Sequence, residues 1–273
     1  MASSVEHRPA RDGTPLLVRR WSPESGTPWA SLVLVHGLAE HSGRYEHVGD
    51  RLAVDGIEAH ALDLRGFGGS GGRRAWVDRW SQLHDDIEGF LVAVRSGAPD
   101  LPVVLYGHSL GGLVVLGYVL DGRARPDLLV LSAPAIDASI PAWQRALLRV
   151  LGRLAPRMRI SNRLASDSLS KDPAVWDDYQ ADPLNEHRST VGFGRAALAE
   201  QQRVASALDR LAIPTLVIHG ADDRLVPSGT SAVLEGRRGV TRRVYDDVRH
   251  ELHNEPEREA VIDDVVAWIR DNV

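Results

Sequence analysis

The stretch VVLYGHSLGGLVVL at residues 103–116 decides the fold of this chain. A short apolar run of β character leads into the pattern Gly-X-Ser-X-Gly at residues 107–111, and an apolar run of helical character follows. A strand, this pattern and a helix, in that order, are typical of a sharp turn that strains its serine and tolerates only glycine at the flanking positions. The stretch therefore predicts that Ser109 is an exposed nucleophile at the carboxyl edge of a sheet, beside a helix N-terminus that favours negative charge.

Short apolar runs alternate with longer helical patterns along most of the chain. The clearest strands are predicted at residues 31–35, 58–62, 103–106, 128–131 and 215–219, with an early antiparallel strand at 18–21 and a late edge strand at 242–245. Continuous apolar runs suit strands that are buried on both faces. The alternation therefore predicts a mostly parallel sheet that is covered by helices on both faces.

One long segment, about residues 135–210, has helical pattern and no convincing strand. It is far longer than a crossover helix requires, so we expect an inserted helical lid between two parts of one core, residues 1–134 and 211–273. One predicted lid helix separates its apolar from its basic side chains, with Trp143, Leu147, Val150, Leu151 and Leu154 on one face and Arg145, Arg149 and Arg153 on the other. That apolar face either packs on the core or meets lipid at a membrane surface.

The composition excludes several classes of function. The 273 residues are 43% hydrophobic and 25% charged, which is ordinary for a globular protein with a sizeable core. A net charge of −5 gives no electrostatic case for binding nucleic acid, and the lack of cysteine excludes disulfides, thiolate zinc sites and a cysteine nucleophile. The N-terminus has no apolar signal segment and no stretch reaches membrane-spanning length, so we expect a cytoplasmic protein that meets a membrane, if at all, through the lid.

A serine nucleophile needs a base, and that base needs a carboxylate to orient it. For a serine on a turn of this kind, the acid and then the histidine follow along the chain. Asp222 and Asp223 come after the strand predicted at 215–219, and His250 and His253 come after the next strand. Both pairs stand at carboxyl ends of strands, where open α/β sheets bind ligands. The spacing alone does not choose within either pair.

Five segments together resemble the monoacylglycerol lipases and the lysophospholipase-like esterases grouped with them. They are HGLAEHSGRY at 36–45, DLRGFGGS at 63–70, GHSLGG at 107–112, YQADPL at 179–184 and HGADDRL at 219–225, so the resemblance covers nearly the whole chain, lid included. It implies an α/β-hydrolase fold, with a mostly parallel eight-stranded sheet, helices on both faces and an inserted helical lid.

The resemblance also implies a role for individual residues. Ser109 would be the nucleophile, Asp223 the acid, because the family's acid directly precedes an Arg-Leu pair, and His250 the base, as the first histidine of a His-X-X-His pair. The backbone N–H groups of Leu38 and Leu110 would form the oxyanion hole. No metal and no organic cofactor is expected.

A polar sub-site for a glycerol head group would consist of Glu40, Arg44, Tyr179 and His253. A carboxylate, a guanidinium and two amphipathic groups can fix two vicinal hydroxyls, and leaving them unpaired would penalise other esters. The alternative for Glu40 and Arg44 is an ion pair that only holds their loop. The alternative for Tyr179 is packing within the lid.

Two residues depart from the family pattern. Ala39 stands where glycine is usual before the glutamate, and its methyl group could restrict the backbone or narrow the head-group pocket. Phe67 stands where a histidine is common, which replaces a polar contact by an apolar one at a position we expect to be structural.

The expected reaction is cleavage of a carboxylic ester through an acyl-enzyme, with a small lipid ester as substrate and monoacylglycerol, split into glycerol and fatty acid, as the expected example. The alternatives on the same scaffold are a lysophospholipase, a general short-chain carboxylesterase and a prolyl peptidase. Dehalogenases and epoxide hydrolases are disfavoured because they have an aspartate nucleophile where Ser109 stands. A non-catalytic receptor that retains the scaffold is the alternative from another class.

Overall fold

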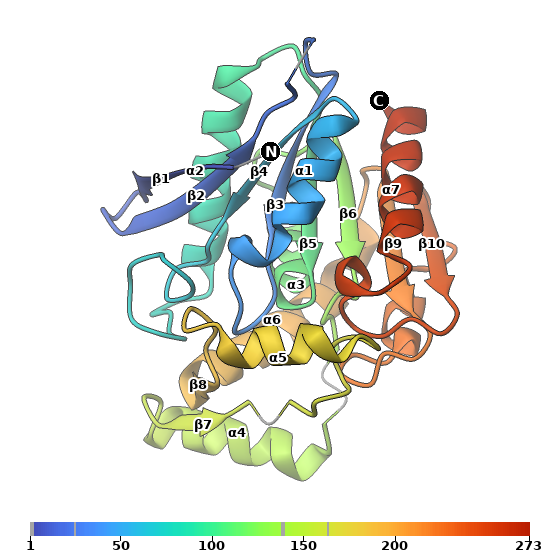
Figure 1. The fold of residues 1–273 in the computed structure, drawn as a ribbon. Coiled ribbons are helices and arrows are strands. Elements are labelled where there is room, and N and C mark those ends of the chain that lie inside the picture. Colours follow the sequence, from blue (N-terminus) through green and yellow to red (C-terminus); the bar gives the residue numbers. More distant parts are fainter. Residues whose placement is uncertain (1–2, 25, 138–139, 163) are drawn as a thin grey trace.

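One eight-stranded sheet runs through the molecule, in the order β1-β2-β4-β3-β5-β6-β9-β10 (Figure 1). The computed structural model describes residues 3–24, 26–137, 140–162 and 164–273. The strands are β1 Ser4–Pro9, β2 Pro15–Trp21, β3 Ala30–Val35, β4 Ile57–Leu62, β5 Val103–His108, β6 Leu128–Ser132, β9 Thr215–Gly220 and β10 Val240–Tyr245. β2 is antiparallel to both of its neighbours, and the strands from β4 to β10 are parallel. The predicted mostly parallel sheet of eight strands is therefore confirmed.

Strand β1 is the one member of this sheet that the apolar pattern does not predict. Its six residues, SVEHRP, are all exposed in the structure. A strand without a buried face carries no hydrophobic alternation, because the alternation records burial. By contrast, every residue of β3, β4, β5, β6 and β9 is buried, which accounts for the continuous apolar runs of these strands.

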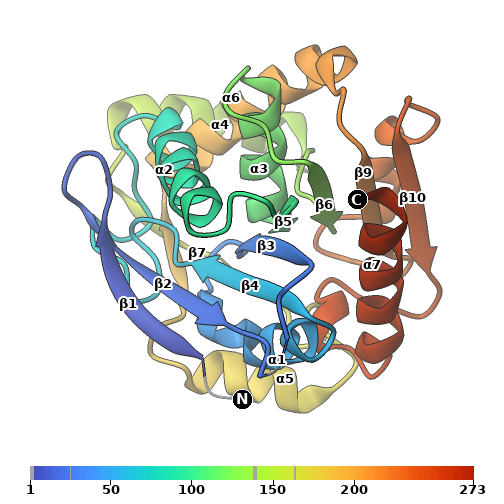
Figure 2. The same cartoon turned by 90° about the horizontal axis from the view of Figure 1, so that it is seen from above.

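Helices cover both faces of the sheet (Figure 2). On one face lie α1 Glu46–Val54 and α7 Arg258–Asn272, and on the other lie α2 Ser81–Gly97, α3 Leu110–Leu120 and α6 Val191–Ala207. All eleven residues of α3 are buried because this helix is enclosed by the sheet, α2 and α6. Such a helix is apolar on every side. The described residues also form four short 3₁₀ helices, namely η1 Ser42–Tyr45, η2 Leu208–Arg210, η3 Ser228–Leu234 and η4 Leu252–Asn254.

The long insertion between β6 and β9 lies at the carboxyl end of the parallel strands (Figure 1). Before α6 it contains α4 Ala142–Leu154, β7 Arg159–Ser161, α5 Pro173–Ala181 and β8 Arg188–Thr190. The expectation that it contains no strand was wrong, since β7 and β8 pair in a small antiparallel sheet. These strands are only three residues long, too short to leave a pattern in the sequence.

The predicted division into residues 1–134, 135–210 and 211–273 stays a prediction, and residues 138, 139 and 163 of the predicted lid lie outside the described part. Helix α6, within the predicted lid, packs on α3, and its Val204 and Ala207 belong to the main core. In the described part of the chain, no helix has the length and apolar character needed to cross a membrane.

Candidate active site

Ser109 sits at the turn between β5 and α3, with φ 51° and ψ −115°. A non-glycine residue is strained in this region of backbone space, and such strain persists only where neighbouring structure enforces it. Here the Ser109 N–H donates to the carbonyl of Ser132 at 2.9 Å, and the Ser109 carbonyl accepts from Ala135 at 2.9 Å. The end of β6 and the segment that follows it therefore hold the serine in its strained conformation.

The two glycines beside this serine are required by close packing. A Cβ atom at Gly107 would lie 2.5 Å from the side chain of Val115. At Gly111 it would overlap the backbone carbonyl oxygen of Val35, at the end of β3. These contacts give the steric reason that the pattern Gly-X-Ser-X-Gly predicted. Helix α3 can begin this close to β3 only if residue 111 has no side chain.

The turn after β9 and the loop after β10 bring an aspartate and a histidine together. Nδ1 of His250 lies 2.7 Å from Oδ2 of Asp223, and both residues are buried. The other carboxylate oxygen of Asp223 accepts hydrogen bonds from the backbone N–H groups of Leu225 and Val226, at 2.9 Å each. The neighbouring Asp222 is exposed. Of the two candidate aspartates, the structure therefore places Asp223 against His250.

The electrostatics of this pair favour a charged imidazole. Burial alone would raise the pKa of Asp223, but the charge of His250 and hydrogen bonds from His219, His250 and the Val226 amide hold it well below its usual value. Burial alone would lower the pKa of His250, but the nearby charge of Asp223 and the hydrogen bond to it outweigh burial and raise this pKa. An imidazole that is oriented and charge-stabilised in this way can take a proton from a serine hydroxyl.

A pocket of about 410 Å³ opens onto Ser109 and His250. This volume is within the usual range of small-molecule sites. One wall, from the loops after β3 and β10 and the end of α5, is polar and contains Glu40, Arg44, Tyr179 and Glu251. Much of the remaining lining is apolar and includes Ala135, Ile140, Leu169, Ala197, Leu225 and Val226. Leu38 and Leu110, whose amides are the expected oxyanion donors, line the same pocket.

The loop after β3 is held by a buried carboxylate. Oε1 of Glu40 accepts from the backbone N–H of Gly37 at 2.6 Å and from the Tyr45 hydroxyl at 2.8 Å. Ala39, just before Glu40, is buried and has a φ of 68°. Glycine adopts this conformation more easily, which is a physical reason why glycine is usual at this position in the family. The carbonyl of Ala39 accepts from the N–H of Glu186, in the insertion between β6 and β9, at 3.0 Å. The insertion between β6 and β9 thus holds the loop that carries Leu38.

His253 does not line this pocket. It is 2% exposed, and its ring stacks on that of Tyr45 with centroids 4.3 Å apart. Among the residues that the structure describes, neither of its ring nitrogens has a hydrogen-bond partner. Burial, and then the neighbouring rings of His108 and His47, hold its pKa well below the ordinary value. The structure therefore brings Glu40, Arg44 and Tyr179 together near Ser109 and leaves His253 behind the pocket.

Two pocket residues were not anticipated from the sequence. His108 precedes the nucleophile, and its ring lies 4.9 Å from that of His250, between centroids. Glu251 follows His250 directly and makes two hydrogen bonds to Arg44. Neighbours of catalytic candidates carry no signal of their own in a single sequence. Phe67, the second departure from the family pattern, is fully buried and packs edge-on against Phe193 of α6, away from the lining of the pocket.

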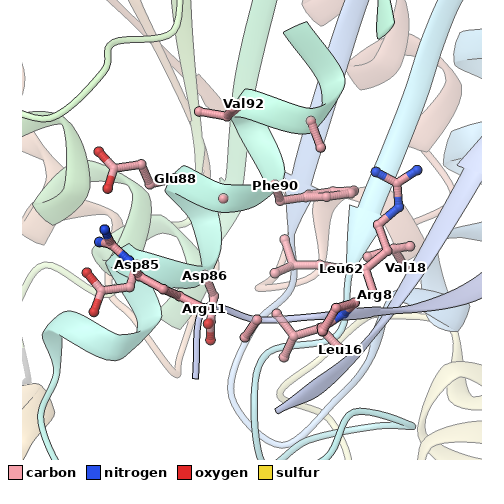
Figure 3. Close-up of a pocket in the computed structure, with 14 residues that line it drawn as sticks. Arg8, Arg11, Leu16, Val18, Leu62, Asp85, Asp86, Glu88, Phe90 and Val92 are labelled. Atoms are coloured by element: carbon pink, nitrogen blue, oxygen red, sulfur yellow. The ribbon is translucent and has the colours of Figure 1, made fainter. Parts of the chain in front are cut away.

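A second, larger hollow of about 590 Å³ lies between the β1–β2 hairpin and α2 (Figure 3). Phe90 and Leu62 form part of its apolar lining, while Arg8 and Glu88 belong to its charged lining. None of its 14 lining residues is a serine or a histidine, so this hollow lacks the two residue types that a Ser-His-Asp site requires. The smaller pocket at Ser109 is therefore the candidate active site. In the described ranges, no cluster of three or more histidine, aspartate or glutamate side chains is arranged to hold a metal ion.

The strained serine, the buried acid–histidine pair and the order of the sheet define this protein as a serine hydrolase with an α/β-hydrolase fold. The family profile described as serine aminopeptidase, S33, matches residues 26–257. The chain is 38% identical to the monoacylglycerol lipase of Mycolicibacterium smegmatis over 255 residues. This alignment covers 91% of this chain and 90% of that protein. It is 32% identical to the monoglyceride lipase of Homo sapiens over 277 residues, 97% of this chain and 90% of the human protein.

Among solved structures, the chain is similar to the monoacylglycerol lipase of Paleococcus ferrophilus, with a TM-score of 0.82 and 28% identity over 94% of this chain and 99% of that one. The chain therefore belongs to the serine aminopeptidase S33 family of α/β-hydrolases and groups with its monoacylglycerol lipases. The resemblance seen in the sequence is confirmed, and the protein is a carboxylic ester hydrolase.

Proposed function

We propose that this protein hydrolyses monoacylglycerols, releasing glycerol and a fatty acid. The observation that carries the proposal is the division of the pocket at Ser109 into a polar wall with Glu40 and Arg44 and an apolar lining. Such a pocket matches a molecule with a small polyol at one end and an acyl chain at the other. Relatives named monoacylglycerol lipase, at up to 38% identity across nearly the whole chain, support this choice of ester.

In the proposed mechanism, His250 removes the proton of Ser109 while the serine oxygen attacks the ester carbonyl. Asp223, at 2.7 Å from Nδ1, holds the imidazole in the required tautomer and stabilises its charged form. The backbone N–H groups of Leu38 and Leu110 donate to the developing oxyanion. Leu110 is the first residue of α3, so its N–H has no acceptor within the helix.

The intermediate then expels the glycerol oxygen, which takes the proton held by His250. Water attacks the resulting acyl-enzyme at Ser109 by the same route, with His250 again as base, and releases the fatty acid. The apolar lining, for example Ile140, Leu169 and Val226, would contact the acyl chain during both steps.

A panel of substrates that share one acyl chain tests this proposal. We expect kcat/KM for 1-monoacylglycerol to exceed that for the lysophosphatidylcholine by about tenfold or more. A pocket wall that hydrogen-bonds a polyol disfavours a head group that leaves its buried polar groups unpaired. An amino-acid nitroanilide should not be cleaved, although the family description names a peptidase. Glu40→Ala should remove the preference over a nitrophenyl ester of equal chain length. Equal rates on all esters would leave a general esterase, and failure of a fluorophosphonate to label Ser109 would leave no serine enzyme at all.

We further propose that the lid makes transient contact with a membrane surface. Most of the apolar face of α4 does not pack on the core: Trp143 is 65% exposed, Leu147 48%, Val150 52% and Leu154 79%, while Leu151 is half-buried. Arg149 and Arg153 on the same helix are also exposed and could meet anionic head groups. Helix α4 lies at the outer end of the insertion, where a flat surface can reach it (Figure 1). An exposed apolar stripe flanked by arginines is the arrangement that interfacial helices share.

The triple replacement Trp143→Ser, Leu147→Ser and Leu154→Ser should lower binding to vesicles that contain anionic lipid by about tenfold or more, since three apolar side chains no longer enter the interface. Co-sedimentation measures this binding. Hydrolysis of a short, water-soluble ester should stay the same. The control replaces Val54 and Val92, which are 72% and 53% exposed on α1 and α2, by serine, and should bind vesicles as the unchanged protein does. Equal loss in both variants would contradict a specific role for α4.

A further inference from the structure

Arg44 lies between two buried carboxylates in the wall of the active-site pocket. Its Nη1 donates to Oε2 of Glu40 at 2.8 Å and to Oε1 of Glu251 at 2.5 Å, and its Nη2 donates to Oε2 of Glu251 at 2.8 Å. The three side chains are 9%, 4% and 4% exposed, for Arg44, Glu40 and Glu251. We call these residues the acidic trio, because two carboxylates share one guanidinium.

The acidic trio leaves the pocket wall with an excess of negative charge. Among the described residues that line the pocket, Arg44 is the only lysine or arginine, and the further acidic residue, Asp137, pairs with Arg145 at 3.2 Å. Burial would lower the pKa of Arg44, but the two glutamates raise it well above its usual value, so the guanidinium stays charged and engaged. In the described lining, an anionic group therefore finds two carboxylates and no lysine or arginine other than Arg44.

The trio also leaves hydrogen-bond acceptors open rather than donors. Oε2 of Glu40 and Oε1 of Glu251 each accept one hydrogen bond, both from Nη1 of Arg44. A carboxylate oxygen offers about two lone-pair positions, so one acceptor position is left on each side of the guanidinium. Two hydroxyl groups of a polyol can donate to such a pair of acceptors. A phosphodiester has no proton to donate there.

We propose that Glu251, acting with Glu40 and Arg44, makes this pocket selective for uncharged polyol head groups and excludes anionic ones. This inference rests on the proposed function and deepens it, because it separates monoacylglycerols from lysophospholipids that carry a net negative charge. Glu251 is the residue that makes the net charge of the acidic trio negative, because Glu40 and Arg44 alone form a neutral pair.

Glu251→Gln tests the inference through a ratio of two substrates with the same oleoyl chain, 1-oleoylglycerol and 1-oleoyl-lysophosphatidylglycerol. We expect the ratio of their kcat/KM values to fall about tenfold in the variant, because a unit charge a few ångströms from the head group is removed from a partly screened pocket. The matched control, Asp137→Asn, lines the same pocket but its side chain is 56% exposed, so solvent screens its charge and the ratio should change less than about twofold. An unchanged ratio in folded Glu251→Gln protein would overturn the inference.

A second measurement uses the unchanged protein and does not depend on folding of the variant. With a short nitrophenyl ester as substrate, glycerol should inhibit competitively, and glycerol 3-phosphate should need about tenfold higher concentration for the same effect. Equal inhibition by both would also overturn the inference. If the protein cleaves nitrophenyl esters but no monoacylglycerol, the proposed function fails on its own, and the two inhibitors still report whether the pocket excludes anions.

Discussion

His250→Ala should lower kcat/KM for a fatty acyl ester by about four orders of magnitude, measured by steady-state release of fatty acid. The loss follows because Ser109 is a weak nucleophile without a base, and His250 is the histidine that the structure pairs with a buried carboxylate. Asp223→Asn should cost about as much, since an asparagine can hold the imidazole in the wrong tautomer. Labelling by a fluorophosphonate should slow in parallel, because it uses the same attack.

The matched controls are the two residues that the sequence could not distinguish from this pair. Asp222→Asn changes an exposed carboxylate, and His253→Ala removes a ring that lies behind the pocket, so each should retain most of the activity. If either variant lost more activity than Asp223→Asn or His250→Ala, the assignment of the acid and the base would be wrong.

The pH profile gives an independent reading of the same pair. The neutral form of His250 is the active base, so kcat/KM should rise as pH increases through its pKa. Because Asp223 raises that pKa, the acid limb of the unchanged protein should lie above the ordinary histidine value of about 6.5. In Asp223→Asn the residual activity should have its acid limb at lower pH.

Most of the fold could be predicted because buried elements have a recognisable pattern of apolar residues in the sequence. The five inner strands are buried on both faces and appear in the sequence as continuous apolar runs. The turn at Ser109 is recognisable because close packing leaves no room for a side chain at the glycines beside it. Strand β1 and the short β7 and β8 leave no such pattern, since β1 has no buried face. The periodicity of α4 predicted an amphipathic helix but not its environment, and the exposure of Trp143 and Leu154 shows that most of the apolar face is open.

The site could be predicted only where a residue type at a given spacing has one well-known catalytic role. Ser109 and the order of acid and base belong to that class. Glu251 does not, because its partner Arg44 is 207 positions away along the chain and only the fold brings them together. His253 shows the opposite limit: a histidine three residues after the base looks like a ligand-binding group, while packing on Tyr45 places it outside the pocket.

The acidic trio should also be a strong determinant of stability, because it joins the loop after β3 to the loop that carries His250. Arg44→Met removes its only cation and leaves Glu40 and Glu251, each 4% exposed in its side chain, without a compensating charge. Breaking a buried ion pair in this way typically costs about 3–5 kcal/mol. We expect a decrease of that size in the free energy of unfolding, measured by urea denaturation at neutral pH.

Arg95→Met is the control, since Arg95 pairs with Asp127 at 3.1 Å with 40% and 47% of the two side chains exposed, and such surface pairs contribute about 0–1 kcal/mol. The double variant Arg44→Met, Glu251→Gln should be more stable than Arg44→Met alone, because it removes one of the two uncompensated carboxylates. That coupling separates charge from packing: a methionine that merely fits the site badly would destabilise both variants equally. A cost below about 1 kcal/mol for Arg44→Met would mean that water or a shifted side chain already compensates the glutamates, and the charge argument for Glu251 would fall with it.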